Sequence, residues 1–148
     1  MNTQYVVAML VGSQLLFACH TAEKEQKAAP KVTAEAEKAL PETPIATVAE
    51  LVKNKTGVVV DANDGDTRKE YGTVPGALLL SNNKSFALSE LPANKTEKLV
   101  FYCGGVKCRA SDAAATRAAS AGYTDVSVMR EGIRGWKSAG QPTEQPRS

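Results

Sequence analysis

The chain has 148 residues, of which 43% are hydrophobic and 23% are charged, and this is the size and composition of one globular domain. Its 18 basic and 16 acidic side chains give a net charge of +2, so no nucleic acid is expected as a partner. Three cysteines and one histidine exclude a disulfide framework and a histidine-rich metal site.

Residues 1–19 carry no Asp, Glu, Lys or Arg, and residues 5–17 are apolar apart from a short Gly-Ser-Gln interruption. A membrane-spanning helix needs about 20 residues, so this run is too short to span a bilayer, but it suits the core of a secretory signal peptide. The segment ends in Leu16-Phe17-Ala18-Cys19, which resembles a bacterial lipobox. We predict a signal peptide over residues 1–18 and an exported protein, lipid-anchored through Cys19 on the periplasmic or cell-envelope side of a membrane. The alternatives are a simple signal peptide with an incidental Cys19, and a short buried helix.

Residues 19–44 have a different composition. They are rich in Lys, Glu and Ala, contain three prolines, and include only Val32 and Leu40 as large apolar residues. A segment of this kind cannot bury a core, which predicts a solvated linker. A coiled-coil arm is the alternative, but the apolar heptad positions that it needs are absent.

From Ile45 onward, short apolar segments alternate with helical patterns. Thr47-Val48-Ala49-Glu50 has the spacing of a capping box, which predicts a short helix running toward Lys53. Residues 58–60 form a β-branched run without polar alternation, which is typical of a buried parallel strand. Further strands are predicted over residues 77–80, 98–102 and 126–129.

Two helical segments complete this pattern. An alanine-rich helix is predicted over residues 111–121, and a last turn or helix over residues 133–138. Strands that alternate with helices predict an α/β fold, with a parallel sheet covered by helices on both faces. The predicted domain covers residues 45–143 and is followed by a tail over residues 144–148.

The third predicted strand leads directly into Cys103-Gly104-Gly105-Val106-Lys107-Cys108-Arg109. In a doubly wound sheet, ligands bind beyond the carboxyl ends of the strands. Glycines let such a loop curl around an anion, and the following helix N-terminus adds its positive end. Together with Lys107 and Arg109, these dipoles are expected to lower the pKa of the Cys103 thiol and make it nucleophilic. The alternative is that Cys103 is a small buried side chain at a strand end.

The order and spacing of several short motifs resemble a rhodanese domain over about residues 45–143. The motifs are Val60-Asp61, Val74-Pro75-Gly76-Ala77, Tyr102-Cys103, Ala113-Ala114, Gly122-Tyr123, and Glu131-Gly132-Ile133 with Trp136, Gly140 and Pro142. The resemblance implies a rhodanese-like α/β fold with a parallel five-stranded sheet. It also implies an active-site cysteine that takes sulfane sulfur from a donor, carries it as a persulfide and passes it to a thiol or cyanide.

Carried over by position, Cys103 is the catalytic cysteine. The loop that would hold its persulfide consists of Gly104, Gly105, Val106, Lys107, Cys108 and Arg109. The implied partners are a small sulfur-donor anion and a thiol acceptor; no metal or organic cofactor is implied, and a monomer is expected. Arg130, Arg134 and Lys137 could rim the pocket and attract an anion, although charged residues in such places are more often only solvated. Trp136 and Tyr123 are expected to be core aromatics.

The chain departs from the family in the loop. A typical rhodanese loop has an arginine at the fifth position after the cysteine, where this chain has Cys108, and Arg109 comes one residue later. Either the loop is one residue longer or Cys108 replaces the arginine. The spacing from Cys103 to Arg109 matches that of cysteine-dependent phosphatases, a related fold, but these usually have His where this chain has Tyr102. A phosphatase or arsenate-type activity is therefore one alternative.

Two further departures bear on function. The family's Asp-x-Arg is Asp61-Ala62-Asn63 here, and its Gly-His-Ile-Pro-Gly-Ala lacks the histidine, since Thr73 occupies that place. We expect Asp61 to bond loop amides in a structural role, with a catalytic base as the alternative. Cys108 could resolve a persulfide or sulfenic acid on Cys103 by forming a disulfide, or it could be a packing residue. A sulfurtransferase is thus the leading hypothesis, with a dithiol redox or thiol-sensing protein and a non-catalytic binding module as alternatives.

Overall fold

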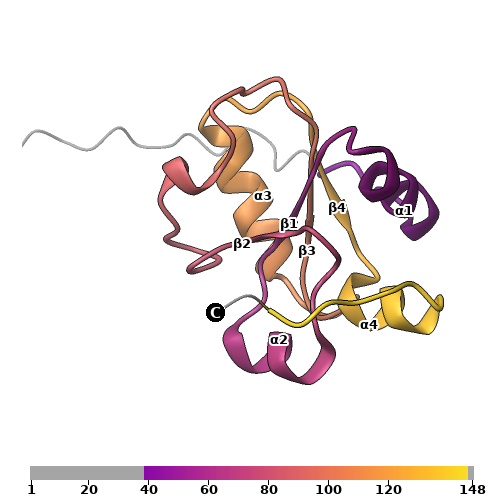
Figure 1. The fold of residues 1–148 in the computed structure, drawn as a ribbon. Coiled ribbons are helices and arrows are strands. Elements are labelled where there is room, and N and C mark those ends of the chain that lie inside the picture. Colours follow the sequence, from indigo (N-terminus) through magenta and orange to yellow (C-terminus); the bar gives the residue numbers. More distant parts are fainter. Residues whose placement is uncertain (1–38, 147–148) are drawn as a thin grey trace, which may run out of the picture. The chain divides into compact units, whose positions relative to one another are not determined.

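The computed structural model describes residues 39–146, so the predicted signal peptide, the lipid site Cys19 and residues 19–38 of the predicted linker lie outside the described residues. A single parallel sheet runs through the domain in the order β2-β1-β3-β4 (Figure 1). Its strands are β1 (Val58–Asp61), β2 (Leu78–Leu79), β3 (Leu99–Tyr102) and β4 (Val126–Met129). Each lies within one residue of its predicted position, so the parallel α/β sheet is confirmed. Among residues 39–146, no helix is long and apolar enough to cross a membrane.

The sheet has four strands in the described part of the chain, not the five that the resemblance implied. The outer edge of β4 is bordered instead by a single parallel bridge between Glu42 and Val128. The Thr43 amide donates to the Val128 carbonyl at 2.9 Å, and the Val128 amide donates to the Pro41 carbonyl at 2.9 Å. Pro41 and Pro44 lack the N–H that a longer ladder needs. A fifth strand is therefore reduced to one bridge at this edge.

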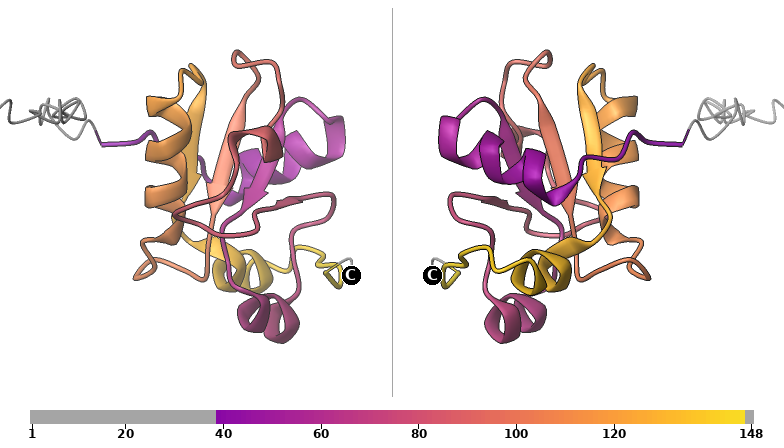
Figure 2. Two further views of the ribbon diagram at one scale, coloured as in Figure 1. Left: turned by 90° about the vertical axis from the view of Figure 1, so that its left-hand side faces the viewer. Right: turned by 90° about the vertical axis from the view of Figure 1, so that its right-hand side faces the viewer.

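Helices lie on both faces of the sheet, as the sequence predicted. Figure 2 shows α3 (Ala110–Ser120) on one side of the strands and α1 (Ile45–Asn54) on the other. Beneath α3 the core contains Val60, Phe101 and Val128 with the alanines of the helix. The opposite cluster packs Val59, Val100 and Tyr102 against α1 and α4 (Gly132–Ser138). Both Trp136 and Tyr123 are buried, which confirms their prediction as core aromatics.

The predicted capping box is wrong. The helix α1 begins at Ile45 with Pro44 as its N-cap, and no side chain caps it. Thr47 therefore lies inside the first turn, because the Pro44 carbonyl already accepts the Val48 amide at 3.1 Å. The extended backbone of Pro44 starts the helix two residues before Thr47.

Two short elements were not predicted. These are α2 (Gly65–Tyr71) and a 3₁₀ turn, η1 (Leu88–Glu90). Neither contains a buried residue, so apolar periodicity could not reveal them. The one local signal was Asp64, whose carboxylate accepts the Thr67 amide at 2.7 Å and caps α2.

Candidate functional site

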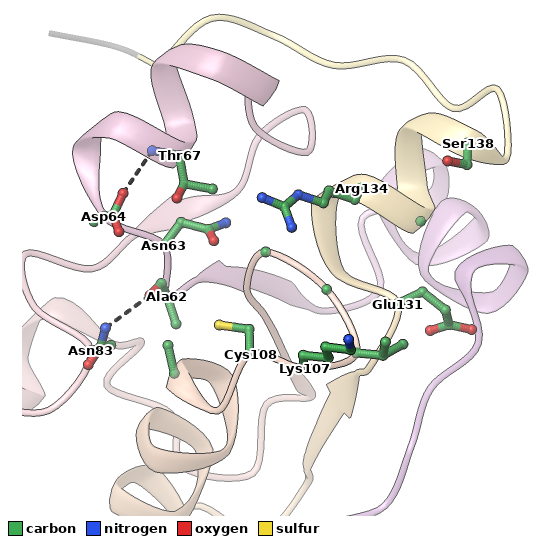
Figure 3. A pocket seen from close by; sticks show the side chains of 15 residues that line it. Ala62, Asn63, Asp64, Thr67, Asn83, Lys107, Cys108, Glu131, Arg134 and Ser138 are labelled. Carbon is green, nitrogen blue, oxygen red and sulfur yellow. Dashed lines mark hydrogen bonds between the residues drawn. The ribbon is translucent and has the colours of Figure 1, made fainter.

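A cavity of about 740 Å³ opens at the carboxyl ends of β1 and β3 (Figure 3). Residues 62–64 after β1 form one wall and residues 104–108 after β3 form the floor, with Glu131, Arg134 and Gly135 of the α4 region opposite. Of the predicted loop, Gly104 to Cys108 line this cavity and Arg109 does not. This cavity thus lies at the end of the sheet where the parallel fold predicts a ligand site.

Cys103 follows β3 directly and is only 2% exposed. Its Sγ lies 3.2 Å from the Ser111 hydroxyl in the first turn of α3. Burial and a hydrogen bond with Cys108 raise the pKa of the Cys103 thiol, and they outweigh the hydrogen bonds from the Ser111 hydroxyl and amide, which lower it. The predicted lowering of this pKa is therefore wrong. The resting protein holds Cys103 as a thiol at neutral pH.

The two basic loop residues, Lys107 and Arg109, do not offset the effect of burial on the pKa of Cys103. Arg109 is 80% exposed at its side chain and lies 3.4 Å from the Asp112 carboxylate. Lys107 is exposed on the rim of the cavity. Charges in contact with water have little effect on a buried sulfur, so the dipoles of α3 act on Cys103 without help from the loop cations.

The loop is fixed from below by the start of α4. The Ile133 amide donates to the Cys103 carbonyl at 2.8 Å, and the Arg134 amide donates to the Gly104 carbonyl at 3.3 Å. Gly132 has a φ of +61°, and a Cβ there would lie 2.3 Å from the Cys103 oxygen. Only glycine fits this contact, which explains the Glu131-Gly132-Ile133 motif physically.

The upper side of the loop leaves backbone donors unpaired. The Cys108 amide donates to the Gly105 carbonyl at 2.8 Å and closes a turn. Within the described residues, the amides of residues 104–107 have no protein acceptor. A curled loop with several free amides beside a helix N-terminus is a general anion-binding arrangement.

Cys108 shares this site with Cys103. It is partly exposed, lines the cavity and forms no disulfide (Figure 3). Its hydrogen bond with Cys103 contributes to the raised pKa of that thiol. Of the two loop thiols, Cys108 is therefore the one that lines the cavity.

Asp61 ends β1 and is fully buried. Its carboxylate accepts the Asn63 amide at 2.7 Å and the Tyr102 hydroxyl at 2.6 Å. That hydroxyl in turn accepts the Val74 amide at 3.0 Å. Burial and the negative charge of Asp61 raise the pKa of Tyr102 above its usual range. Asp61 thus joins β1, β3 and the segment before β2.

Arg68 completes this network and was not found from the sequence. Its Nη2 donates to the Asp61 carbonyl at 3.0 Å and to the Leu80 carbonyl at 2.9 Å, and its Nε lies 3.4 Å from the Asp61 carboxylate. The signal that could have found it is the buried Asp61 itself, because a buried carboxylate requires a cation or several donors.

The three basic residues expected near the pocket, Arg130, Arg134 and Lys137, lie in different parts of the structure. Only Arg134 lines the cavity. Arg130 pairs with Glu42 and Asp112 on another side of the domain, and Lys137 lies 5.7 Å from the centre of the Tyr71 ring. Asn63 also lines the cavity, and no role for its side chain was predicted.

Comparisons with known proteins agree with this fold. A protein from Bacillus halodurans is 26% identical, with 70% of this chain and 76% of that chain covered at a TM-score of 0.61. A Rhodopseudomonas palustris protein of unknown function, described as a possible tyrosine phosphatase, is 25% identical, with 71% and 85% covered at 0.59. Thiosulfate sulfurtransferase from Pseudomonas aeruginosa is 23% identical and has a TM-score of 0.62; the match covers 77% of this chain but 22% of that one.

Among curated proteins, no significant match was found. A model of the rhodanese-like domain matches residues 45–139. That range is more than half of the chain and includes every element from α1 to α4. The chain therefore belongs to the rhodanese-like domain family.

Proposed function

We propose that the protein is a sulfurtransferase that carries sulfane sulfur as a persulfide on Cys103. The observation that carries this proposal is the position of Cys103. The thiol is buried at the carboxyl end of β3. It lies at the start of a loop whose amides of residues 104–107 lack protein acceptors and whose residues 104–108 line an open cavity. A persulfide is an anion with one more atom than a thiolate, and free amides stabilise such an anion.

The first half-reaction begins with loss of the Cys103 proton to solvent. The thiolate then attacks the outer sulfur of a donor such as thiosulfate. A sulfur–sulfur bond forms to Cys103, the sulfur–sulfur bond of the donor breaks, and sulfite leaves with the electron pair. The Ser111 hydroxyl lies 3.2 Å from the Cys103 sulfur, and the Ser111 hydroxyl and amide both lower the pKa of this thiol, so they favour the thiolate that this step needs.

The second half-reaction returns the enzyme to its starting state. A thiolate acceptor or cyanide attacks the outer sulfur of the persulfide, and Cys103 leaves as a thiolate that takes up a proton. The loop amides stabilise the negative charge on the sulfur before and during this transfer. Neither half-reaction needs an external oxidant or reductant.

Intact mass spectrometry tests the proposal. The full chain incubated with thiosulfate should gain the mass of one sulfur atom and should turn over thiosulfate with cyanide. Cys103→Ser should lose both properties, whereas Cys108→Ser should keep the sulfur adduct. A wild-type protein that gains no sulfur would exclude the sulfurtransferase.

A dithiol redox protein is the second candidate, because both loop thiols are free and Cys108 lies near enough to raise the pKa of Cys103. Exchange with a partner disulfide would form a Cys103–Cys108 disulfide, with two electrons passing to the partner, which is released as a dithiol. A glutathione disulfide buffer should then remove the mass of two hydrogen atoms from wild type but not from Cys108→Ser. If both thiols stay free in that buffer, this candidate is excluded.

Two other candidates find less support. A phosphatase would use Arg109 on its substrate, but Arg109 pairs with Asp112 and does not line the cavity; an assay with a phosphate ester decides this point. A non-catalytic binding module would leave Cys103 without special reactivity. Preferential alkylation of Cys103 over Cys108 near neutral pH would exclude it.

We also propose, from the sequence alone, export of the protein and lipid attachment at Cys19. The proposal includes a monomeric domain at the cell envelope, held by the segment over residues 19–44. The mass of the N-terminal peptide of the native protein tests it, because cleavage before Cys19 with an added lipid gives a mass that simple cleavage does not.

A further inference from the structure

Asn63 carries a donor that the protein itself does not use. The residue is only 8% exposed, and its side-chain Nδ2 is buried without a hydrogen-bond partner. Arg68 Nε is the other such nitrogen among the described residues, but it lies 3.4 Å from the Asp61 carboxylate. Because buried donors are rarely left unpaired in folded proteins, the Asn63 amide has capacity for an acceptor from outside the protein.

Arg134 carries a second unused donor. It is the one arginine of residues 39–146 whose side chain makes no hydrogen bond or ion pair, since Arg68, Arg109, Arg117 and Arg130 all have such partners. Its guanidinium carbon lies 4.8 Å from the centre of the Tyr71 ring. Stacking on an aromatic ring restrains a guanidinium and leaves its N–H edge open to an anion.

The two side chains flank the same pair of loop glycines. A Cβ on Gly104 would lie 3.8 Å from Asn63 Oδ1, and a Cβ on Gly105 would lie 4.0 Å from Arg134 Cδ. Figure 3 shows the Asn63 amide and the Arg134 guanidinium pointing toward one another over this part of the loop. The space between them is therefore bounded by donors on two sides, above a loop whose own amides lack acceptors.

The two carboxylates that line the cavity do not occupy this space. Asp64 accepts the Thr67 amide at 2.7 Å, and hydrogen bonds from Thr67 lower the pKa of Asp64. Glu131 lies on the opposite side of the loop from Asn63 (Figure 3). The space between Asn63 and Arg134 thus favours a negatively charged group.

We infer that Asn63 and Arg134 bind the oxyanion half of the sulfur donor, and that they select donors in which an oxyanion group adjoins the transferable sulfur. This inference rests on the proposed sulfurtransferase function. The loop amides hold the sulfur that is transferred, and the two side chains hold the oxygens of the part that leaves. As the donor's sulfur–sulfur bond breaks, negative charge grows on the leaving group, where Arg134 stabilises it.

The test compares two alkylating reagents of similar size at Cys103. Iodoacetate carries a carboxylate and iodoacetamide is neutral, and both react with the thiolate, so the ratio of their rates cancels any change in the thiolate fraction. Arg134→Gln should lower the iodoacetate-to-iodoacetamide ratio about tenfold, which is the lower end for a hydrogen bond to a charged group. Asn63→Asp, which keeps the side-chain shape and adds a repelling charge, should lower it at least as much.

Lys137→Gln is the matched control. Lys137 lies on the same helix as Arg134 and contacts the same Tyr71 ring, but it does not line the cavity. Its removal should leave the ratio within about twofold, the range of screened surface charges. An equal fall in Lys137→Gln, or no fall in Arg134→Gln, would overturn the inference.

The alkylation ratio does not depend on sulfur transfer, so the two proposals can fail separately. If wild type forms a persulfide but the ratio is unchanged in both variants, only the oxyanion site is wrong. If wild type forms no persulfide, the sulfurtransferase is wrong and, with it, the assignment of a sulfur donor to this site. Where both hold, the KM for thiosulfate should rise about tenfold in Arg134→Gln and stay unchanged in Lys137→Gln.

Discussion

Asp61 and Asn63 are two residues apart, yet they differ in whether their side chains have hydrogen-bond partners within the protein. The Asp61 carboxylate has a donor at each oxygen and an arginine beside it. The Asn63 amide nitrogen is buried with no acceptor, and it faces the cavity beside loop amides that also lack acceptors.

This difference distinguishes the side chains that stabilise the domain from the hydrogen-bond donors that remain available for a ligand. A buried network around a fully bonded carboxylate adds rigidity and is weakened when one member is removed. A set of unsaturated donors costs stability in the resting protein and gains favourable bonds only when a ligand supplies acceptors. The same end of the sheet thus contains both kinds of region, and single substitutions should distinguish them.

The largest effect is expected for Asp61→Ala. The substitution leaves the Tyr102 hydroxyl and the buried Arg68 charge without the carboxylate between them. Removing one partner of a buried charge pair typically costs about 3–5 kcal/mol, so the free energy of unfolding should fall by about that amount. Urea denaturation of wild type and variant measures it.

Tyr102→Phe is the matched control for this network. It removes one hydroxyl, keeps the ring in the core and leaves Asp61 with the Asn63 amide and Arg68. The hydroxyl bonds both the Asp61 carboxylate and the buried Val74 amide, so a loss of about 2–3 kcal/mol is expected. If Asp61→Ala costs no more than Tyr102→Phe, the network does not have the structural role described above.

The next largest effect is expected for Gly132→Ala, which tests the underside of the loop. The new Cβ would lie 2.3 Å from the Cys103 oxygen at a φ of +61°, so overpacking and a left-handed backbone together should cost about 3 kcal/mol. Because the clash lies at Cys103, alkylation of that thiol should also change. Gly140→Ala is the control, since it shares a positive φ but meets no atom within 4 Å; an equal loss there would assign the effect to backbone strain alone.

A smaller effect is expected for Asn63→Ala. The variant removes a buried donor that has no partner and keeps the backbone amide that bonds Asp61. Loss of packing and relief of an unpaired polar group oppose each other, so the free energy of unfolding should stay within about 1 kcal/mol of wild type. A loss as large as that of Asp61→Ala would show that the Asn63 side chain belongs to the Asp61 network.

The central strands β1 and β3 could be predicted from the sequence because each contains an unbroken β-branched or apolar run of largely buried residues, as in Val58-Val59-Val60. Elements whose residues stay at the surface were missed, as α2 shows. The implied fifth strand failed because prolines at positions 41 and 44 limit pairing with β4 to one bridge.

The site likewise has one part that could be predicted from the sequence and one part that could not. Its backbone part could be predicted, because Cys103, the glycines and the helix start are adjacent in the chain. The pKa of Cys103 could not, since burial depends on how closely α3 and α4 pack around the loop. Asn63 and Arg134 lie 71 positions apart, and only the fold brings them to one cavity.

The smallest effects concern the ionisation of Cys103, where the two regions meet. Hydrogen bonds from Ser111 lower the pKa of this thiol, and the hydrogen bond with Cys108 raises it. Ser111→Ala should therefore raise the pKa and slow alkylation at neutral pH, because only the thiolate reacts. Cys108→Ala should lower the pKa and speed the same reaction.

Iodoacetamide labelling of the Cys103 peptide across pH gives both midpoints, with Ser120→Ala at the far end of α3 as the control. Midpoints that move in the same direction in both variants would contradict opposing roles for Ser111 and Cys108, and would leave burial as the sole control on the nucleophile.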